Sequence, residues 1–516
     1  MVARTPRRVL AAFAGLLSAS LVLSGCLYSQ IPAEQPQSSA SPTPETDGIA
    51  EDLLPFYEQT LEWDSCETAM ECAIVTAPLD WENPGLGEIE LAIIRSRATG
   101  GEAIGSLLTN PGGPGASGLG FIRDSISYAV GEDVRQNFDV IGFDPRGVGE
   151  STAVTCFTDT ANMDSYLFDI PENSRGSDAW SDELLAGSAE FAAACEANSD
   201  GILPYITTDQ SARDMDLLRG VLGDSELYYL GYSYGTFLGA TYAKLFPERV
   251  GRLVLDAAID PSVSGLEVGT TQGVGFESAL RAYMADCIEG SDCPFRGTVD
   301  QGMADLGTLL AGADRFPQQG ADGRLLGADT LLTAIIAALY SEDSWPYLTA
   351  ALTDTLAGDP ELAFTLADFY YNRSGGVYLD NQTEAFSAYN CLDYPNDSTP
   401  EDEAASQALL EAEAPTVAPY WSGPDGCDEW PYPPSGVREP ISADGAAPIV
   451  VVGTTNDPAT PYEWSVALAE QLSSGVLVTR VGEGHSGYNK GNACVDGAIE
   501  TYLIDGTPPE DGLRCE

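Results

Sequence analysis

Histidine is nearly absent from this sequence, and no two cysteines are spaced as Cys-x-x-Cys. The 516 residues contain one histidine, His485, and eleven cysteines. Structural zinc sites are built from closely spaced cysteine pairs or from several cysteines and histidines. We therefore expect no metal site, and no motif in the chain indicates a cofactor.

Basic residues are also scarce. The chain has 23 lysines and arginines against 79 aspartates and glutamates, so its formal net charge is −56 at pH 7. Such a charge repels phosphate groups at low salt, which argues against nucleic acid or an anionic lipid surface as a partner. A ligand with a cationic group would be attracted. Solubility or a saline habitat explains the same charge equally well.

The apolar run at the N-terminus is too short for a membrane span. It covers residues 9–23, follows three arginines and ends in Leu23-Ser-Gly-Cys26. This pattern is typical of an exported lipoprotein, with an ordinary signal peptide as the alternative. We predict a signal peptide over residues 1–25 and a lipid anchor on Cys26, holding the protein to the outer face of the cell membrane. Residues 26–50, rich in Pro, Ser, Gln, Thr and Glu, are expected to form a disordered tether.

The other ten cysteines are an even number in a chain marked for an oxidising compartment, which predicts five disulfide bonds. Close spacing favours local pairs, and the remaining cysteines would complete a sequential pattern. The expected pairs are Cys66–Cys72, Cys156–Cys195, Cys287–Cys293, Cys391–Cys427 and Cys494–Cys515.

Apolar and β-branched runs predict an α/β sheet. The first two candidate strands alternate like a hairpin, and the later ones are continuously apolar, which is typical of parallel strands covered on both faces. The candidates are residues 73–79, 89–97, 105–109, 138–143, 226–230, 252–256, 448–452 and 476–481.

A long segment of helical character interrupts these strands at residues 262–446. An insertion of that size is a domain and not a loop. We therefore expect residues 51–261 and 447–516 to form one α/β core, with residues 262–446 as a mainly helical cap over one edge.

The most specific local motif is Gly231-Tyr-Ser233-Tyr-Gly235. It follows a candidate strand and precedes a stretch with helical periodicity. This Gly-x-Ser-x-Gly context is typical of α/β-hydrolases, in which a sharp turn presents the serine hydroxyl above the sheet. The alternative is a glycine-rich turn whose serine caps the helix. The motif predicts an α/β-hydrolase fold with Ser233 as nucleophile.

A serine nucleophile needs a base, and the base needs a carboxylate. His485 follows the last candidate strand in a glycine-rich segment, in the position expected for the base. Asp457 follows the penultimate strand, where α/β-hydrolases carry the acid. Asp444 is the nearest competitor, but it precedes that strand. We predict Ser233, Asp457 and His485 as the catalytic triad.

Acyl transfer also needs hydrogen-bond donors for the oxyanion. The backbone NH of Tyr234, directly after the nucleophile, is expected to be one donor, and Gly113 or Gly112 in the segment Asn110–Gly118 is expected to supply the other. A phosphate-binding loop is the rival interpretation of these glycines. No lysine follows, and prolines remove NH donors, so we favour the oxyanion hole.

Five segments of the chain form a recognisable set: Asn110–Gly118, Asp144–Ser151, Gly231–Gly235, Asn456–Pro461 and Gly484–Gly487. Together they resemble the secreted tripeptidyl aminopeptidases of actinobacteria, which are related to proline iminopeptidases. Similar envelope-attached proteases occur in mycobacteria. The resemblance covers nearly everything after residue 60 and is weakest in the cap. It implies hydrolysis of peptides from a free N-terminus, with the cap limiting how much chain can enter.

The resemblance also bears on single residues. The predicted triad matches the family's position by position, and Thr460 stands where relatives often carry a threonine after the aspartate. Residues 389–393 partly match a family segment that reads Ala-Ile-x-Cys-x-Asp. Asp393 would then bind a substrate ammonium, although a structural role near a disulfide is equally open.

Three functions follow for testing. The first is a serine exopeptidase that releases short peptides through an acyl-enzyme on Ser233, and the family resemblance implies tripeptides. The second is a carboxylesterase or lipase with the same machinery, since fold alone does not separate the two. The third is a binding lipoprotein that keeps a hydrolase fold, which the complete set of serine, histidine and aspartate disfavours.

Overall fold

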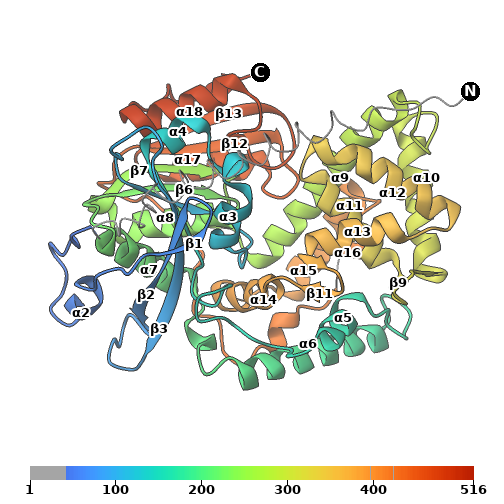
Figure 1. Ribbon diagram of the computed structural model, residues 1–516. Helices are drawn as coiled ribbons and strands as arrows, with labels where there is room; N and C mark the ends of the chain where they lie inside the picture. Colours follow the sequence, from blue (N-terminus) through green and yellow to red (C-terminus); the bar gives the residue numbers. More distant parts are fainter. Residues whose placement is uncertain (1–41, 396, 422) are drawn as a thin grey trace, which may run out of the picture. The chain divides into compact units, whose positions relative to one another are not determined.

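A ten-stranded sheet lies at the centre of the computed structural model, which describes residues 42–395, 397–421 and 423–516 (Figure 1). The strand order is β1-β2-β3-β5-β4-β6-β7-β12-β13-β14. The pairs β1–β2, β2–β3 and β3–β5 are antiparallel. All other neighbours in this sheet are parallel. The predicted α/β architecture is confirmed.

Every strand predicted from the sequence is present, with small shifts at the ends. Two short edge strands, β1 and β14, were not predicted. The strands of the sheet are β1 Asp64–Glu67, β2 Met70–Pro78, β3 Glu88–Ser96, β4 Ser106–Asn110, β5 Asp139–Phe143, β6 Leu227–Tyr232, β7 Val250–Asp256, β12 Ile449–Asn456, β13 Gly475–Glu483 and β14 Leu513–Cys515.

Helices cover both faces of the sheet. Leu107 and Leu108 are adjacent in β4, are both fully buried, and belong to different apolar clusters. Successive side chains of a strand point to opposite faces, so each cluster occupies one face. The helices of the core are α2 Leu54–Tyr57, α3 Gly118–Ala129, α4 Glu132–Asn137, α7 Thr208–Val221, α8 Tyr234–Leu245, α17 Tyr462–Gln471 and α18 Ala493–Asp505, with short 3-10 helices η2 Leu203–Tyr205 and η3 Pro247–Arg249.

A helical insertion between β7 and β12 has its own apolar core, built around side chains such as Leu280, Leu306 and Ile335. The mainly helical cap is therefore confirmed as part of the fold. Its elements are α9 Gly265–Glu289, α10 Val299–Arg315, β8 Gln318–Gln319, β9 Leu325–Leu326, α11 Ala328–Leu339, η4 Glu342–Ser344, α12 Trp345–Ala357, α13 Glu361–Tyr370, β10 Arg373–Ser374, β11 Val377–Tyr378, α14 Gln382–Asp393, α15 Pro400–Glu413, α16 Ala418–Trp421 and η5 Gly426–Glu429.

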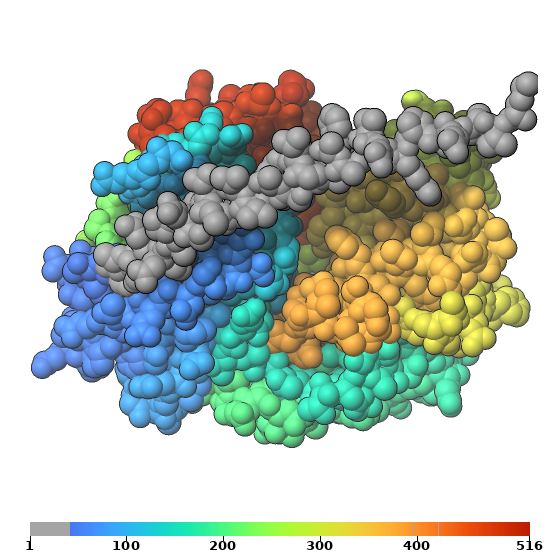
Figure 2. All heavy atoms as spheres, in the orientation of Figure 1, coloured from blue at the N-terminus to red at the C-terminus, as the bar shows by residue number. Residues whose placement is uncertain are grey.

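A second excursion from the sheet, between β5 and α7, contacts the cap. It contains α5 (Thr160–Phe168) and α6 (Asp178–Asn198), which lie beside the cap helices in Figures 1 and 2. Arg373 of the cap pairs with Asp164 of α5 at 2.9 Å. Arg175 pairs with Asp329 of the cap at 2.6 Å. These ion pairs join core-derived helices to the insertion.

The N-terminal segment is described only from Pro42. The predicted signal peptide and Cys26 lie outside the described residues. Of the predicted tether, residues 42–50 follow the core surface, where the NH of Glu45 donates to the carbonyl of Gly220 at 2.8 Å. No helix in the described ranges combines the length and the apolar character that a membrane crossing requires.

All five predicted disulfide bonds are present. Cys156–Cys195 closes the excursion that contains α5 and α6. Cys391–Cys427 joins α14 to η5 within the cap, and Cys494–Cys515 joins α18 to β14. The pattern is sequential, as expected from the spacing.

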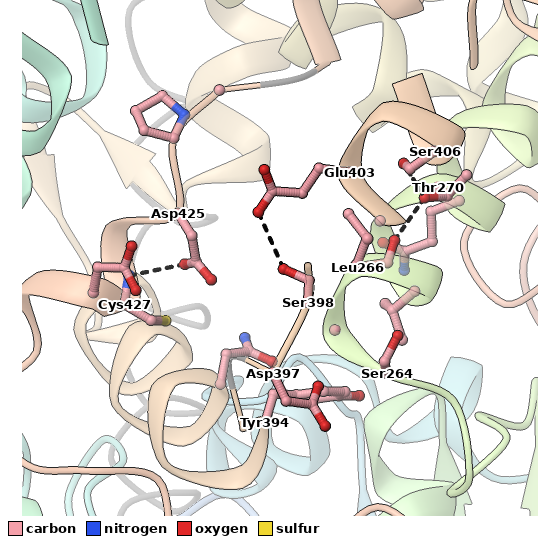
Figure 3. A pocket seen from close by; sticks show the side chains of 18 of the residues that line it. Ser264, Leu266, Thr270, Tyr394, Asp397, Ser398, Glu403, Ser406, Asp425 and Cys427 are labelled. Carbon is pink, nitrogen blue, oxygen red and sulfur yellow. Dashed lines mark hydrogen bonds between the residues drawn. The ribbon is translucent and has the colours of Figure 1, made fainter. Parts of the chain in front are cut away.

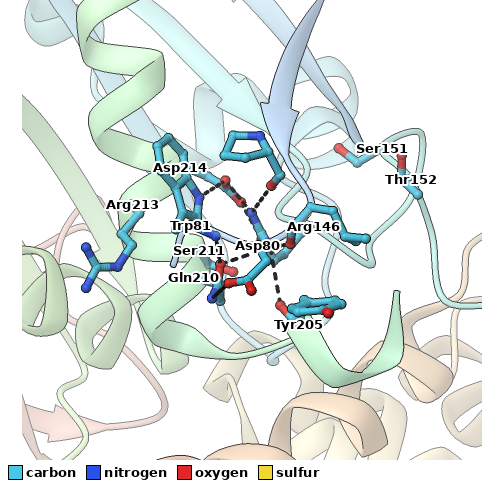
Figure 4. A network of polar contacts seen from close by, with 12 residues as sticks. Asp80, Trp81, Arg146, Ser151, Thr152, Tyr205, Gln210, Ser211, Arg213 and Asp214 are labelled. Atoms are coloured by element: carbon cyan, nitrogen blue, oxygen red, sulfur yellow. Dashed lines mark hydrogen bonds and ion pairs between the residues drawn. The ribbon is translucent and has the colours of Figure 1, made fainter. Parts of the chain in front are cut away.

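A buried ion pair anchors the loop after β5 (Figure 4). The guanidinium of Arg146 is fully buried and donates to both carboxylate oxygens of Asp214, on α7, at 2.8 and 2.7 Å. It also donates to the carbonyl of Leu79 at 2.8 Å. Trp81 adds a third donor to Asp214 through its indole NH at 2.8 Å. This network fastens the end of β2, the loop after β5 and α7 together.

Replacing Asp214 with alanine is expected to lower the free energy of unfolding by about 3–5 kcal/mol, because it leaves the Arg146 charge buried and unpaired. Urea denaturation followed by tryptophan fluorescence measures the change. Arg213→Ala is the control, since its pair with Asp209 is 33% and 53% exposed and contributes less than about 0.5 kcal/mol. Equal losses in the two variants would contradict the argument.

Candidate active site

Ser233 lies on a strained turn between β6 and α8, as predicted. Its φ and ψ are 54° and −122°, which is unusual for a residue with a side chain. The flanking glycines make the turn possible. A Cβ on Gly231 would lie 2.5 Å from the carbonyl oxygen of Gly235, and one on Gly235 would lie 2.8 Å from Oδ1 of Asn110. The serine hydroxyl is thus presented at the end of the sheet.

Asp457 and His485 are brought together from separate loops. Asp457 follows β12, is 3% exposed, and places each carboxylate oxygen 2.9 Å from Nδ1 of His485. The carboxylate also accepts the NH groups of Ala459 and Thr460 at 2.9 Å. These donors fix its orientation, so it can hold the imidazole with the proton on Nδ1.

The other ring nitrogen of His485 is available. Nε2 is buried and has no hydrogen-bond partner among the residues that the structure describes. Tyr340 holds His485 from the cap side. Its carbonyl accepts the backbone NH of His485 at 2.9 Å, and its ring meets the imidazole edge-on, with the ring centroids 5.2 Å apart. An imidazole with a carboxylate on Nδ1 and an open Nε2 has the geometry of a general base.

The three predicted residues lie at one edge of the sheet. Strands β6, β7, β12 and β13 are consecutive and parallel, so their C-terminal ends meet at the same edge. Ser233 follows β6, Asp457 follows β12, and His485 follows β13. Ligand sites in open α/β sheets lie beyond this edge.

The segment after β4 packs against the turn of Ser233. A Cβ on Gly112 would lie 2.9 Å from Cβ of Ser233 and 3.2 Å from the NH nitrogen of Tyr234. Gly112 has φ +99° and Gly113 has φ +108°, which favours glycine at both positions. The NH of Gly112 donates to Oδ1 of Asn110 at 2.9 Å. The NH of Gly113 makes no hydrogen bond to another described residue.

Asp393 lies in the cap at the end of α14, and its carboxylate faces the core. The side chain is 4% exposed. It accepts the NH of Thr208 at 3.0 Å and the Thr208 hydroxyl at 2.6 Å. That hydroxyl is 2.5 Å from the hydroxyl of Tyr234. Burial raises the pKa of Asp393 to about 6, and its bonds with Thr208 oppose the shift. Asp393 therefore connects α14 to the residue after Ser233.

A cavity of about 610 Å³ opens within the cap (Figure 3). Among the described residues, every charged side chain in its lining is a carboxylate. Glu403 and Asp425 point into it from opposite walls. The lining carboxylates are Asp397, Glu403, Asp425 and Asp428, and the apolar and aromatic part includes Leu266, Val268, Phe386, Tyr394, Leu410 and Trp421.

Two walls of this cavity touch the loops of the predicted active site. Gln272 of α9 donates to the carbonyl of Ala459, two residues after Asp457, at 2.8 Å. Gly115, near the end of the segment that packs on Ser233, abuts the NH of Phe386 so closely that a Cβ there would lie 2.9 Å away. An aromatic series also runs from Trp421 at the cavity through Phe276 and Tyr340 to His485. The cavity walls therefore contact the loops that carry the candidate site, whereas none of the three predicted catalytic residues lines the cavity.

The sequence interpretation missed Tyr340 and Asp256, which both contact the His485 loop. Tyr340 ends a cap helix that gives no hint of its neighbour. Asp256 ends a predicted buried strand. A carboxylate at the end of such a strand is the feature of the sequence that could have identified it as a site residue. Its backbone carbonyl accepts the NH of Ser233 at 3.0 Å, and its carboxylate accepts the NH of Gly487 at 2.8 Å.

Comparison with known proteins agrees with this architecture. A family model described as TAP-like protein matches residues 414–515, and one described as alpha/beta hydrolase fold matches residues 105–300. Serine protease Hip1 of Mycobacterium tuberculosis is 33% identical over 534 residues, which cover 98% of each chain. Carboxylesterase B of the same organism is 37% identical, covering 97% of this chain and 98% of that protein.

A third relative is the tripeptidyl aminopeptidase of Streptomyces lividans. It is 30% identical over 473 residues, which cover 88% of this chain and 86% of that protein. The predicted α/β-hydrolase fold is thus confirmed. The protein is a serine hydrolase, and it belongs to the α/β-hydrolase family that includes the tripeptidyl aminopeptidases and their mycobacterial relatives.

Proposed function

We propose that Ser233, His485 and Asp457 act as nucleophile, base and orienting acid of a peptidase. The observation that carries this proposal is the bond from His485 to Asp457, which leaves Nε2 open at the edge where Ser233 stands. Ser233 attacks the carbonyl carbon while Nε2 takes its proton. His485 returns the proton to the leaving amine, and water repeats the cycle on the acyl-enzyme.

The oxyanion of each tetrahedral intermediate needs two donors. The NH of Tyr234 is the first, because it follows the nucleophile at the start of α8. For the second we favour Gly113 over Gly112, because the Gly112 NH already donates to Asn110. Both glycines belong to the segment that touches Ser233.

The substrate that we propose is a peptide with a free N-terminus, from which short peptides, tripeptides by analogy with the relative so named, are released. The acidic cavity in the cap supports this choice, since carboxylates attract an ammonium group and apolar walls suit side chains. These cavity carboxylates are exposed and can meet a substrate ammonium, whereas Asp393 is only 4% exposed. A carboxylesterase is the second candidate, supported by the relative called Carboxylesterase B at 37% identity.

The proposed location is outside the cytoplasm, with the lipid on Cys26 as the membrane anchor. Five disulfide bonds support an oxidising compartment, because such bonds are rare in cytosolic proteins. The net charge of −56 repels an anionic membrane surface. The lipid anchor is therefore the one attractive contact with the membrane that we propose.

A substrate panel tests the peptidase proposal. We expect amide release from tripeptide nitroanilides with a free N-terminus, and a kcat/KM at least about tenfold lower after N-acetylation, which removes a charge-assisted contact. In the double variant Glu403→Gln/Asp425→Asn, kcat/KM for free peptides should fall by about three- to tenfold, whereas hydrolysis of a neutral ester stays unchanged.

Glu413→Gln is the matched control, because this exposed carboxylate of α15 does not line the cavity. It should leave both activities unchanged. Equal turnover of free and acetylated peptides would sink the exopeptidase proposal. Ester turnover without any amide turnover would favour the carboxylesterase.

A further inference from the structure

Asp256 stands between the strands that lead to Ser233 and to Asp457. It is the last residue of β7, and it lies beside Tyr232 of β6 on one side and Val452 of β12 on the other. Its carbonyl accepts the NH of Ser233 at 3.0 Å, and the next residue, Ala257, donates its NH to Val452 at 2.9 Å. The backbone at this point therefore fixes the turn of Ser233 against the strand that leads to Asp457.

The side chain of Asp256 reaches across to the loop of His485. One carboxylate oxygen accepts the NH of Gly487 at 2.8 Å, and the other accepts the NH of Tyr488 at 2.8 Å. These two residues follow His485 by two and three positions. The loop is thus held by two carboxylates: Asp457 binds the imidazole, and Asp256 binds the backbone beyond it.

The surroundings of the Asp256 carboxylate disfavour a charged group. Asp256 is fully buried, and burial raises its pKa to about 6. The two NH donors and the charge of Lys490 favour the ionised form. Ala257 has φ 62°, a conformation that costs about 1 kcal/mol or more without a glycine. A buried charge next to a strained residue, between catalytic loops, points to a role other than filling space.

We propose that Asp256 is a positioning residue, which holds the His485 loop and the Ser233 turn in the relative position that the reaction requires. This inference rests on the proposed roles of Ser233 and His485. Serine attack requires Nε2 and Oγ to be aligned, and a misplacement of about 1 Å lowers turnover by about 100-fold. Asp256 contacts both segments and neither reacting atom, so it acts through their placement.

Asp256→Asn tests the proposal with little change in volume. Asparagine keeps one acceptor oxygen and puts an NH2 group against the second backbone NH, so the loop must shift. We expect kcat for an activated ester to fall by about 10- to 100-fold, with KM within about twofold of wild type. Labelling by a fluorophosphonate, in which Oγ of Ser233 bonds to phosphorus and fluoride leaves, should slow by a similar factor.

Asp216→Asn is the control for lost stability. Asp216 is also fully buried and accepts hydrogen bonds, from Tyr57 and Arg219, but lies on α7 away from the catalytic loops. It should melt at a lower temperature and keep the wild-type kcat. A normal kcat in Asp256→Asn, or an equal kcat loss in both variants, would overturn the inference.

Gly487→Ala keeps the proposal testable if the asparagine variant does not fold. A Cβ at Gly487 would lie 2.8 Å from Cγ1 of Val452, the neighbour of Asp256 in β12, so the methyl group displaces the loop from that strand without changing any charge. The same fall in kcat at constant KM is expected, and unchanged turnover would refute the proposal. Ester and fluorophosphonate readouts do not depend on peptide specificity, so failure of the peptidase proposal is detected separately, with the substrate panel.

Discussion

Replacing Ser233 with alanine is expected to lower kcat by about 10⁵-fold or more for every substrate, peptide or ester. The variant removes the only atom that we propose to bond to the acyl group, so what remains is the weak effect of binding and of the oxyanion donors. The turn itself should persist, because its flanking glycines and the bond from residue 233 to the carbonyl of Asp256 involve the backbone. Initial rates at saturating substrate measure the loss.

Ser199→Ala is the matched control for this prediction. Ser199 is 3% exposed and its hydroxyl exchanges two hydrogen bonds with the backbone of Thr155. Its loss should lower stability by about 1 kcal/mol and leave kcat unchanged. After fluorophosphonate treatment, mass spectrometry should find the label on Ser233 and none in Ser233→Ala. Label on another serine, with activity retained in Ser233→Ala, would refute the assignment.

Local chemistry made the central strands and the Ser233 turn predictable. The strands that carry the proposed site are continuously apolar because both faces are covered, and strict glycines flank the serine because a Cβ at either position would clash. Asp457 could be proposed among 79 acidic residues because it follows the penultimate strand, and His485 because it is the one histidine and follows the last predicted strand. The disulfide pairs followed from spacing because each closes a short excursion.

Contacts between distant segments were not predictable from one sequence. Tyr340 and His485 are far apart in the chain, and their contact depends on how the cap sits over the sheet edge. The inward orientation of Asp393 depends on Thr208, in another helix. Strands β1 and β14 escaped notice because they have four and three residues and little apolar pattern. The hydrophobic periodicity of a segment indicates which of its faces is buried, but not which other segment packs against that face.

Asparagine at position 457 is expected to disable the base while keeping its shape. One carboxylate oxygen of Asp457 accepts the NH groups of Ala459 and Thr460, both at 2.9 Å. The amide oxygen of asparagine will occupy that place, because an NH2 group there would oppose two donors. The NH2 then faces Nδ1 of His485, which must accept a hydrogen bond from it. The imidazole consequently carries its own proton on Nε2, and the nitrogen that should deprotonate Ser233 is blocked.

We therefore expect Asp457→Asn to lower kcat by about 10⁴-fold, with KM nearly unchanged, because the wrong tautomer affects chemistry and not binding. Steady-state kinetics on a peptide amide and an ester should show the same factor, and fluorophosphonate labelling of Ser233 should slow in parallel. Asp444→Asn is the matched control, since this exposed aspartate precedes β12 and lacks the contact with the imidazole. Loss of activity in Asp444→Asn, with activity kept in Asp457→Asn, would mean that the pair seen between Asp457 and His485 is structural and that the base is oriented by another group.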